Sequence, residues 1–555
     1  MEDRTTTAHP SAGAPLSGEV VSMRQGTWSL LWIVYRRHPR AAGIAMMALA
    51  LVIAGGVVSA VQYFRADRAA RETAEAQLRA ESSEGIMRRA LAAADAAAAR
   101  QLVHQGRPAG ALPHLARAVR LAPDNSPAAA DLLLLLAQTP LLREAAPGSG
   151  TPQSALLSPA MAEQESGPGT SITTLDFSGP FLFSAEQAGT CRRWHVPTLE
   201  EVHPAKPFPF RPLAIRALDE ATATVALADG SCHRWTAGSD PTEAVPPQRP
   251  PFGLWETAAL SPQGMEAAFA RAPRAYDPSE PASGYLITNL AAGISTATGT
   301  SLPSRALALN AQDALASGWW DGRIGLTPRG QGQRRELKHH RAAVTALTFS
   351  GDSSRLLSGD THGTLVLWDL PGAQPVAELP APVSAVAFSR NGSRFAAACG
   401  SRIYLFDAAT RQGLGLPLEA EETVTAIALD REGGIVAAGL ARGAIRLWHL
   451  PTANCKAPAW LADFAEAWSG GHLNNSSEIE SRRDPVKPNT FRIAVDASRA
   501  SHPAAAALYD WLMSPPSKRS LSPWAPWSLT EYLEMTSRRP GRAQRAEERP
   551  PTRKE

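Results

Sequence analysis

Residues 339–370 read HHRAAVTALTFSGDSSRLLSGDTHGTLVLWDL, and this stretch decides the fold class. Apolar residues alternate with others from Val344 to Thr348, which predicts a half-buried β-strand. Gly351-Asp352 is typical of a turn into a second strand. A tight turn at His362-Gly363 then leads into a third strand that ends at Trp368-Asp369. The stretch therefore predicts three consecutive antiparallel strands, which need further sheets to cover their faces.

The same pattern recurs on both sides of this stretch, at a spacing of roughly 40 residues. The six further copies are residues 172–196, 212–238, 257–290, 304–328, 384–408 and 423–450. The positions that correspond to Trp368 in these copies are Trp194, Trp235, Asn289, Thr327, Phe406 and Trp448. One blade cannot bury both faces alone, whereas a ring of blades buries them all and leaves only short edges. Seven copies predict a closed seven-bladed β-propeller over residues 171–454, and six or eight blades are the alternatives.

These copies resemble WD40 repeats, whose marks are a histidine before the first strand and Trp-Asp at the end of the third. The positions that match the repeat's structural residues are His340, Trp194, Trp235, Trp368, Asp369, Phe406, Asp407 and Trp448. The resemblance also implies an acid, just before the glycine of the second turn, that bonds the histidine. Only Asp229 and Asp321 hold that place, so we expect this polar network to be absent from most blades.

Residues 41–64 predict a membrane-spanning helix. The 18 residues from Ala41 to Val58 carry no charge, and arginines flank both ends of the segment. A helix over 41–64 would be ~36 Å long, enough to cross a ~30 Å hydrocarbon layer. A cleaved signal peptide and a buried soluble helix are the alternatives. The 40 residues before the segment and its apolar length favour an anchor over a signal peptide.

The rest of the chain divides by composition. We predict a disordered or juxtamembrane segment (1–40), a helical stalk and hairpin (65–140), a linker (141–170), a helical extension (455–534) and a disordered basic tail (535–555). Within the hairpin, Ala111, Leu115, Ala118 and Pro123 resemble the second helix of a tetratricopeptide repeat, and a generic helical hairpin is the alternative. The fold class is thus mainly β, with helices on both sides of the propeller in sequence.

Neither composition nor motifs predict catalysis. The formal net charge is only +3, so no nucleic-acid partner is expected. The chain has four cysteines, without the spacing of a zinc site. No phosphate-binding loop, nucleophile elbow or kinase signature occurs. The side chains of His339 and His340 point to opposite sides of a strand, which argues against a metal pair. We expect no catalytic, cofactor-binding or metal-ligating residues, and not an enzyme.

The order of span, hairpin, WD40-like repeats and helical tail resembles the C-terminal part of bacterial membrane-anchored serine/threonine protein kinases, without their kinase domain. This resemblance implies a single-pass protein of the bacterial inner membrane, related to signalling or the cell envelope. We expect a non-catalytic scaffold that binds proteins through its propeller, with a cytoplasmic N-terminus and an exported propeller. A ligand-sensing or enzymatic central channel and a passive membrane organiser that acts through its stalk are the alternatives.

Overall fold

A computed structural model of the chain forms two compact units, residues 1–87 and residues 88–555. The structure describes residues 39–105, 107–144, 162–165, 170–197, 200–202, 205–240, 242–245, 254–271, 285–298, 304–312, 314–328, 334–370, 372–452, 456–474, 476–481, 488–515, 518–520, 522–528 and 530–531. Residues 1–38 of the predicted segment 1–40, and the whole predicted tail 535–555, lie outside this set.

The first unit contains most of α2 (Pro39–His104), a helix of 66 residues that ends in the second unit. Within α2, the segment Met46–Tyr63 is long and apolar enough to cross a membrane, by length and composition. Large apolar side chains are exposed along this segment, and those of Leu51 and Val52 are 67% and 71% accessible. An aqueous surface seldom carries such a continuous apolar stretch. Membrane insertion itself stays a prediction.

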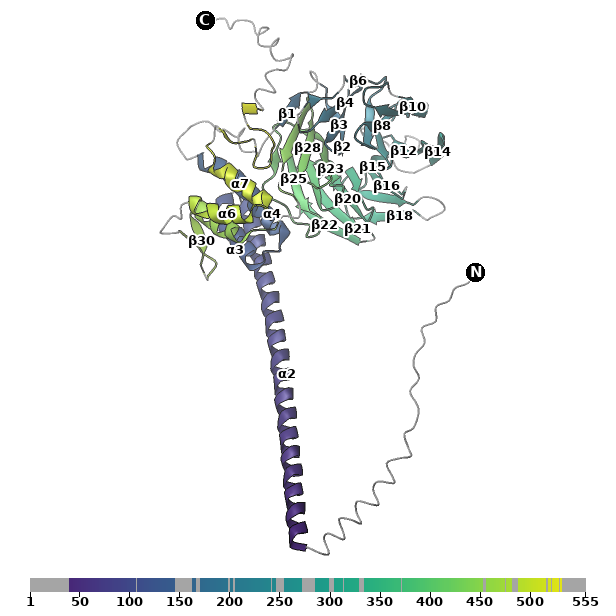
Figure 1. Ribbon diagram of the computed structural model, residues 1–555. Coiled ribbons are helices and arrows are strands. Elements are labelled where there is room, and N and C mark those ends of the chain that lie inside the picture. The colour runs from purple at the N-terminus through teal and green to yellow at the C-terminus, as the bar shows by residue number, and fades with distance from the viewer. Residues whose placement is uncertain are drawn as a thin grey trace, which may run out of the picture. The chain divides into compact units, whose positions relative to one another are not determined.

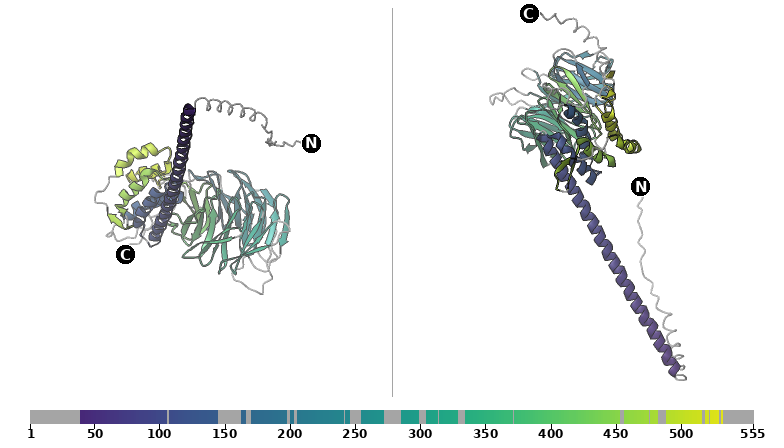
Figure 2. Two further views of the ribbon diagram at one scale, coloured as in Figure 1. Left: turned by 90° about the horizontal axis from the view of Figure 1, so that it is seen from below. Right: turned by 90° about the vertical axis from the view of Figure 1, so that its left-hand side faces the viewer.

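The second unit contains seven antiparallel sheets, each of at least four strands, arranged as the blades of a propeller (Figures 1 and 2). Blade 1 comprises β2 (Ile172–Ser178), β3 (Phe181–Glu186), β4 (Thr190–His195), β5 (Glu200–Glu201) and β6 (Lys206–Pro207). Blade 2 comprises β7 (Pro212–Ala217), β8 (Thr222–Leu227), β9 (Cys232–Thr236) and β10 (Thr242–Val245). Blade 3 comprises β11 (Thr257–Leu260), β12 (Glu266–Ala270), β13 (Tyr285–Asn289) and β14 (Ile294–Thr298).

The next three blades follow in chain order. Blade 4 comprises β15 (Ser304–Leu309), β16 (Leu315–Trp319), β17 (Arg323–Thr327) and β18 (Arg335–Lys338). Blade 5 comprises β19 (Val344–Phe349), β20 (Arg355–Asp360), β21 (Thr364–Asp369) and β22 (Gly372–Glu378). Blade 6 comprises β23 (Val383–Phe388), β24 (Arg394–Cys399), β25 (Arg402–Asp407) and β26 (Leu418–Glu419). The seven-bladed ring predicted from the repeats is thereby confirmed.

Blade 7 joins two distant parts of the chain. Its inner three strands are β27 (Val424–Leu429), β28 (Ile435–Leu440) and β29 (Ala444–His449). Its outer strand is β1 (Ala162–Glu165), which pairs antiparallel with β29 and brings Ala162 opposite Leu447. These four residues lie in the segment 141–170, which was predicted to be a linker, and their sequence, AEQE, lacks an apolar alternation. A strand that precedes blade 1 in the chain therefore completes the last blade and closes the ring.

Blade-to-blade packing relies on small residues in the second strands. Gly359 in β20 faces the first residue of the next blade, and a Cβ atom there would lie 2.4 Å from Val383 Cγ1. Gly439 of blade 7 faces Ile172 of blade 1 in the same way, also at 2.4 Å. Real Cβ atoms do not come this close to other heavy atoms. These glycines set the distance between neighbouring blades, since any larger side chain would force the sheets apart.

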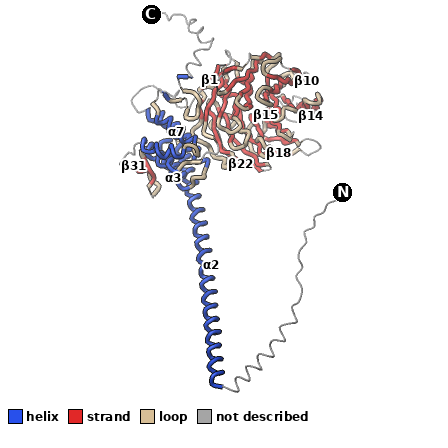
Figure 3. Tube along the Cα trace, in the orientation of Figure 1, coloured by secondary structure: helices blue, strands red, loops and turns tan. Residues whose placement is uncertain are grey.

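Helices from both flanks of the propeller form a helical module (blue in Figure 3), which we define as residues 88–144 and 459–513. Its elements are the end of α2, α3 (Pro108–Leu121), α4 (Ser126–Glu144), α5 (Ala459–Ser469), η2 (Pro488–Phe491), α6 (Arg492–Ser498) and α7 (Pro503–Met513), with the hairpin β30 (Gly471–Leu473) and β31 (Ile479–Ser481). The module shares one apolar core with blades 6 and 7.

Helix α3 packs between the other parts of the module. Its residues Ala111, Leu115 and Ala118, on which the tetratricopeptide-like pattern was based, are buried. One neighbour of α3 is α4, and another is α5, which lies more than 330 residues later in the chain. Arg120 of α3 pairs with Glu466 of α5 at 3.0 Å. The hairpin is thus completed by the chain's own tail, and the likeness to a tetratricopeptide repeat stays a prediction.

Three side chains of the module bind the loop between β25 and β26 of blade 6. Arg100 donates to the side chain of Gln412, Asp131 accepts the Gly415 N–H at 2.9 Å, and Gln138 accepts the Leu416 N–H at 3.2 Å. Burial raises the pKa of Asp131 to about 7, against the opposing effect of Arg100, whose Nε lies 4.0 Å away. The outer strand of blade 6 has only two residues, since this loop turns toward the helices instead.

Candidate recognition sites on the propeller

Blade 5 contains a complete buried chain of hydrogen bonds. The indole N–H of Trp368 donates to Ser358 Oγ at 2.8 Å, and Ser358 Oγ lies 2.6 Å from Nε2 of His340. The other ring nitrogen of His340, Nδ1, lies 2.9 Å from Asp360 Oδ2. With the proton on Nδ1, every group donates to the next, from Trp368 to Asp360. The chain links the loop before β19 to the two middle strands of the blade.

The charges of this network follow from its burial. The side chains of His340 and Asp360 are fully inaccessible. Burial lowers the pKa of His340 below its usual value, although Asp360 opposes this effect. Burial acts to raise the pKa of Asp360, but hydrogen bonds from the Thr364 N–H, His340 and the His362 N–H hold it below its ordinary value. The network is therefore a neutral imidazole on an ionised carboxylate at neutral pH.

The acid of this network is not where the repeat resemblance placed it. The residue just before Gly363 is His362, whereas the carboxylate bonded to His340 is Asp360, at the end of β20. Asp229 and Asp321, which hold the expected place, accept N–H groups of their own turns instead, from Ser231 and Arg323. These two carboxylates stabilise tight turns. The expected position was wrong by two residues, because the acid lies at the end of the strand.

The other aromatic positions of the repeats are buried, with fewer polar partners. Trp194 donates to Ser184 at 2.9 Å, while Trp235 Nε1 and Trp448 Nε1 have no hydrogen-bond partner within the described part of the chain. Phe406 stacks on Phe395, with ring centroids 5.0 Å apart. These blades keep the wedge-shaped aromatic but not the whole polar chain, in line with the sequence expectation that blades rely on apolar packing.

Asp369 and Asp407, the acids after the aromatic residue, bond to side chains and turns of blades 5 and 6. Asp369 Oδ2 lies 3.4 Å from Arg411 of blade 6. Asp369 pairs with Arg355 of the neighbouring strand at 2.8 Å. Asp407 Oδ1 accepts the N–H of Thr410 at 2.7 Å and so shapes the turn after β25. Both residues fix local structure, and neither faces a cavity that could hold a ligand.

Blade 4 departs from the pattern. Thr327 takes the place of the aromatic residue on the third strand and is half-buried. The large side chain instead comes from Trp319 on the second strand, which is 1% exposed. Trp319 pairs with Ser304 as Asp360 pairs with Val344, so it occupies the place of the network acid. The sequence shows the tryptophan but does not show which strand holds it. The pair Trp319-Trp320 lies where one strand ends and a turn begins.

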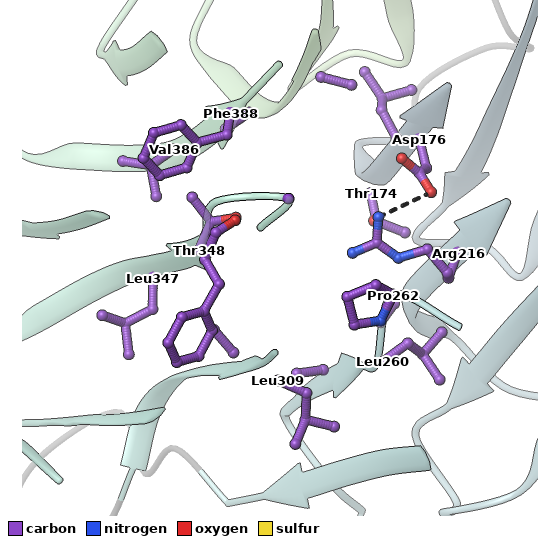
Figure 4. Close-up of a pocket in the computed structure, with 18 of the residues that line it drawn as sticks. Thr174, Asp176, Arg216, Leu260, Pro262, Leu309, Leu347, Thr348, Val386 and Phe388 are labelled. Atoms are coloured by element: carbon purple, nitrogen blue, oxygen red, sulfur yellow. Dashed lines mark hydrogen bonds and ion pairs between the residues drawn. The ribbon is translucent and has the colours of Figure 1, made fainter. Parts of the chain in front are cut away.

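The innermost strands of all seven blades line a central cavity of about 410 Å³. Its wall includes Leu309, Leu347 and Val386, with the ion pair of Asp176 and Arg216 on one side (Figure 4). The volume falls in the range of small-molecule sites, ~300–1,000 Å³. The polar groups of its wall decide what this cavity could hold.

Arg390, in the turn after β23 of blade 6, reaches toward blades 1 and 2. Its Nη2 donates to the carbonyl oxygens of Phe177 at 2.7 Å and Ala217 at 3.2 Å. The same nitrogen lies 3.6 Å from Asp176 Oδ2. This guanidinium ties blade 6 to blades 1 and 2 along the wall of the cavity. The charges that the cavity contains are therefore partnered by one another or by backbone carbonyls.

The described residues contain no candidate metal centre. No group of three or more His, Cys, Asp or Glu side chains among them could hold a metal ion. Cys191, Cys232 and Cys399 are free thiols in buried positions, and burial raises the pKa of Cys191 and of Cys232. A thiol with a raised pKa is a poor nucleophile. What the arrangement offers is a rigid ring with exposed loops and edges, which suits recognition.

The comparisons with known proteins agree with this fold. The family described as "WD domain, G-beta repeat" matches residues 331–369 and 373–407, which cover β18 of blade 4, nearly all of the strands of blade 5 and the first three strands of blade 6. The small ribosomal subunit protein RACK1 of Schizosaccharomyces pombe is 31% identical over 123 residues, which is 20% of this chain and 39% of that protein. The U3 small nucleolar RNA-associated protein 21 of Saccharomyces cerevisiae is 26% identical over 125 residues, 22% of this chain and 13% of that protein.

The chain thus spans less than half the length of each of these curated relatives. The family match falls on the repeats that keep most of the expected motif, and blade 5 is the one with the complete hydrogen-bond chain. The family match and the sheet topology agree: the chain carries WD40 repeats and folds into a seven-bladed β-propeller.

Proposed function

We propose that this protein is a non-catalytic scaffold, held at a membrane by residues 41–64, whose propeller binds partner proteins. The observation that carries the proposal is the pairing of a closed seven-bladed ring with a single apolar segment, Met46–Tyr63, in one chain. A rigid ring presents loops and strand edges at fixed positions, as recognition requires. The fold alone does not define the function, so the proposal depends on experiments with partners.

Membrane attachment is tested by fractionation. The full-length chain should stay in the membrane pellet after washing with alkaline carbonate, and Leu51→Arg/Val52→Arg should move it to the supernatant, since a charge at the centre of a span costs about 3 kcal/mol. The control is Ile493→Arg, an exposed apolar residue of α6 (84% accessible), which should stay with the pellet. Release of the unaltered chain by carbonate would refute the anchor.

Partner binding is tested by crosslinking in native membranes. We would compare the full-length chain with residues 1–87, the first of the two compact units. If the propeller is the binding part, the shorter chain loses the crosslinked partners. Capture of the same set by both chains would refute recognition by the propeller and favour a membrane organiser that acts through its helix.

Orientation and signalling belong to the same proposal. We infer an exported propeller and a cytoplasmic N-terminus, with a role in signalling or in the cell envelope beside a separately encoded kinase. A reporter that is active only outside the cytoplasm, fused to the C-terminus, should be active. Activity only of a cytoplasmic reporter would reverse the orientation.

A second candidate function is favoured by the central cavity of about 410 Å³, which is large enough for a small ligand. Asp176 and Arg216 would be its polar contacts, if their mutual ion pair opened. A ligand in the cavity should raise the melting temperature of the full-length chain, and Leu347→Trp should abolish that rise by filling the space. The partnered charges of the wall make this the weaker candidate.

A further inference from the structure

The departure of blade 4 from the repeat pattern has a consequence at the protein surface. Trp319 ends its second strand, Trp320 begins the turn that follows, and arginines lie over both rings. The guanidinium carbon of Arg305 lies 4.7 Å from the ring centroid of Trp320, and that of Arg334 lies 4.1 Å from the ring centroid of Trp319. Proteins tend to break a local structural rule where a function requires it.

The stacking prepares the arginines for binding. A tryptophan ring covers one face of a guanidinium and holds its orientation, while the N–H groups at the edge stay available. Arg334 is exposed and Arg305 is half-buried. Gly325 makes room for this arrangement, because a Cβ there would lie 2.6 Å from Trp319 Cζ2 and 2.9 Å from Arg334 Nε. An ordered guanidinium loses less entropy on binding than a mobile one.

The charge of this region is positive and unevenly paired. Arg323 is occupied by Asp321 at 2.6 Å and by Glu336 at 3.0 Å. Lys338 is 70% exposed and lies 3.9 Å from Glu336, at the outer limit of an ion pair. Arg305 and Arg334 form no ion pair with any described acid. The region therefore attracts carboxylates, with Arg334, Arg335 and Lys338 as exposed cations on or beside β18.

The outer strand of the same blade is an edge. Among the described strands β18 pairs only with β17, so one side of its backbone is unpaired. An extended segment of another protein can pair with such an edge, and charges on its side chains then decide specificity. Charges also serve to keep edges from aggregating. The stacked arginine distinguishes the two roles, since repulsion of other edges needs charge but no ordered guanidinium.

We propose that blade 4 binds an acidic, extended protein segment, with its backbone along β18 and its carboxylates on Arg334 and Lys338. Arg305 beside Trp320 would receive a further carboxylate nearer the channel. This inference names the kind of partner for the scaffold proposed above and rests on that proposed function. A protein segment fits better than nucleic acid, because nucleic-acid binding commonly neutralises about 6–10 phosphates, more than these few cations can contact.

The test uses the full-length chain in nanodiscs of neutral lipid. The probe is a fluorescein-labelled twelve-residue peptide in which Glu and Asp alternate with Thr and Val, read by fluorescence anisotropy. Arg334→Gln/Lys338→Gln should weaken its binding at least tenfold, since each charged hydrogen bond contributes about 1.5–3 kcal/mol. The matched control is Arg402→Gln/Arg442→Gln, which removes two exposed cations from blades 6 and 7 and should change Kd less than twofold.

Two further measurements separate this site from a general charge effect. Arg334→Lys keeps the charge but loses the planar fork, so it should still weaken binding severalfold. A peptide with Gln and Asn in place of the acids should bind at least tenfold more weakly. Equal losses in both double variants, or equal binding of the neutral peptide, would overturn the proposal.

Tighter binding of a uridine dodecanucleotide, lost in the same double variant, would mark a nucleic-acid site and also overturn it. The scaffold function is judged separately. If Arg334→Gln/Lys338→Gln keeps all membrane crosslinks and the peptide does not bind, this inference fails while the proposed function stands. If the full-length chain and residues 1–87 capture the same partners, the proposed function fails whatever the peptide does.

Discussion

Blades 5 and 4 are neighbours built on the same strand pattern, yet they are stabilised by different means. Blade 5 joins its strands through Trp368, Ser358, His340 and Asp360, all buried and hydrogen-bonded. Blade 4 has a serine at the same place, Ser317, but no aromatic residue on the third strand and no acid on the second. One blade stabilises the ring, while the other exposes arginines on tryptophan rings. The repeat pattern therefore tolerates the loss of its network where the ring is supported on both sides.

The largest expected difference concerns the third strand. Trp368→Ala should lower the free energy of unfolding by about 3–5 kcal/mol, because it leaves a large cavity and removes the indole donor of Ser358. The corresponding change in blade 4, Thr327→Ala, should cost less than about 1 kcal/mol, since Thr327 is half-buried. Urea denaturation of the full-length chain measures both. Similar losses would mean that the two blades do not differ as described.

The buried acid of blade 5 gives the next largest effect. Asp360→Ala should cost about 3 kcal/mol, because His340 would keep its buried Nδ1–H without an acceptor. A matched change on the surface, Asp369→Ala, removes the ion pairs with Arg355 and Arg411. Because this acid is 39% exposed, the change should cost less than about 1 kcal/mol. The same denaturation series compares them. A loss at Asp369 as large as that at Asp360 would contradict the importance of the network.

Blade 4 can be tested through its glycine. Gly325→Ala should cost about 1–3 kcal/mol, because the new Cβ would displace Trp319 and Arg334 from their stack. It should also weaken binding of the acidic peptide, because binding depends on the stacked arginine. Gly372→Ala in blade 5 is the control, since the nearest atom to a Cβ there is 3.7 Å away. An unchanged peptide affinity in Gly325→Ala would separate the stack from recognition.

The smallest expected effect is a pH response, which distinguishes blade 5 from the helical module. The folded-state pKa of Asp131 is raised from its ordinary value to about 7, so the folded state binds more protons and this group lowers stability as pH rises from about 4 to 7. Asp131→Asn should therefore raise the free energy of unfolding at pH 8 by about 1–2 kcal/mol. The pKa shift corresponds to a gain of at most about 4 kcal/mol at this pH. Part of it is offset because the Gly415 N–H bonds an amide oxygen less strongly than a carboxylate.

His340 should act in the opposite direction. Its pKa is lowered on folding, so the unfolded state binds more protons and stability is lost as pH falls from about 6.5 toward the folded-state pKa. Urea denaturation between pH 5 and 8 resolves the two slopes. Asp131→Asn should keep the loss of stability that occurs as pH falls below about 6.5. It should remove the loss of stability that occurs as pH rises toward 7. A variant with the same pH profile as the unaltered chain would contradict the assignment to Asp131.

The sequence predicts the ring well because each blade is local. Its strands, turns and wedge residues such as Trp194, Trp235 and Trp448 lie within about 40 residues of one another, so periodicity alone reveals them. Residue positions that depend on strand register were harder to predict from the sequence. Asp360 was missed because the register places the network acid inside β20, and the aromatic of blade 4 was assigned to Thr327 rather than to Trp319.

Contacts between distant segments were beyond local patterns. The pairing of β1 with β29 and the packing of α3 on α5 each join residues more than 280 positions apart. The polar sequence of β1 acquires strand structure only from its partner, since four residues bury too little to form a strand alone. The candidate site on blade 4 depends on cation–π geometry, which no spacing rule expresses.

The closing strand also has a consequence in time. Ala162 leaves the ribosome 285 residues before its partner Leu447, an interval of about 15–60 s at ~5–20 residues per second. Throughout that interval the ring is open, and the edges of its first and last blades are unpaired. If α2 is inserted during synthesis, the unfinished ring is held at the membrane surface while it waits. Attachment would then keep incomplete propellers apart from one another, so that each closes on its own first strand rather than on a neighbour's.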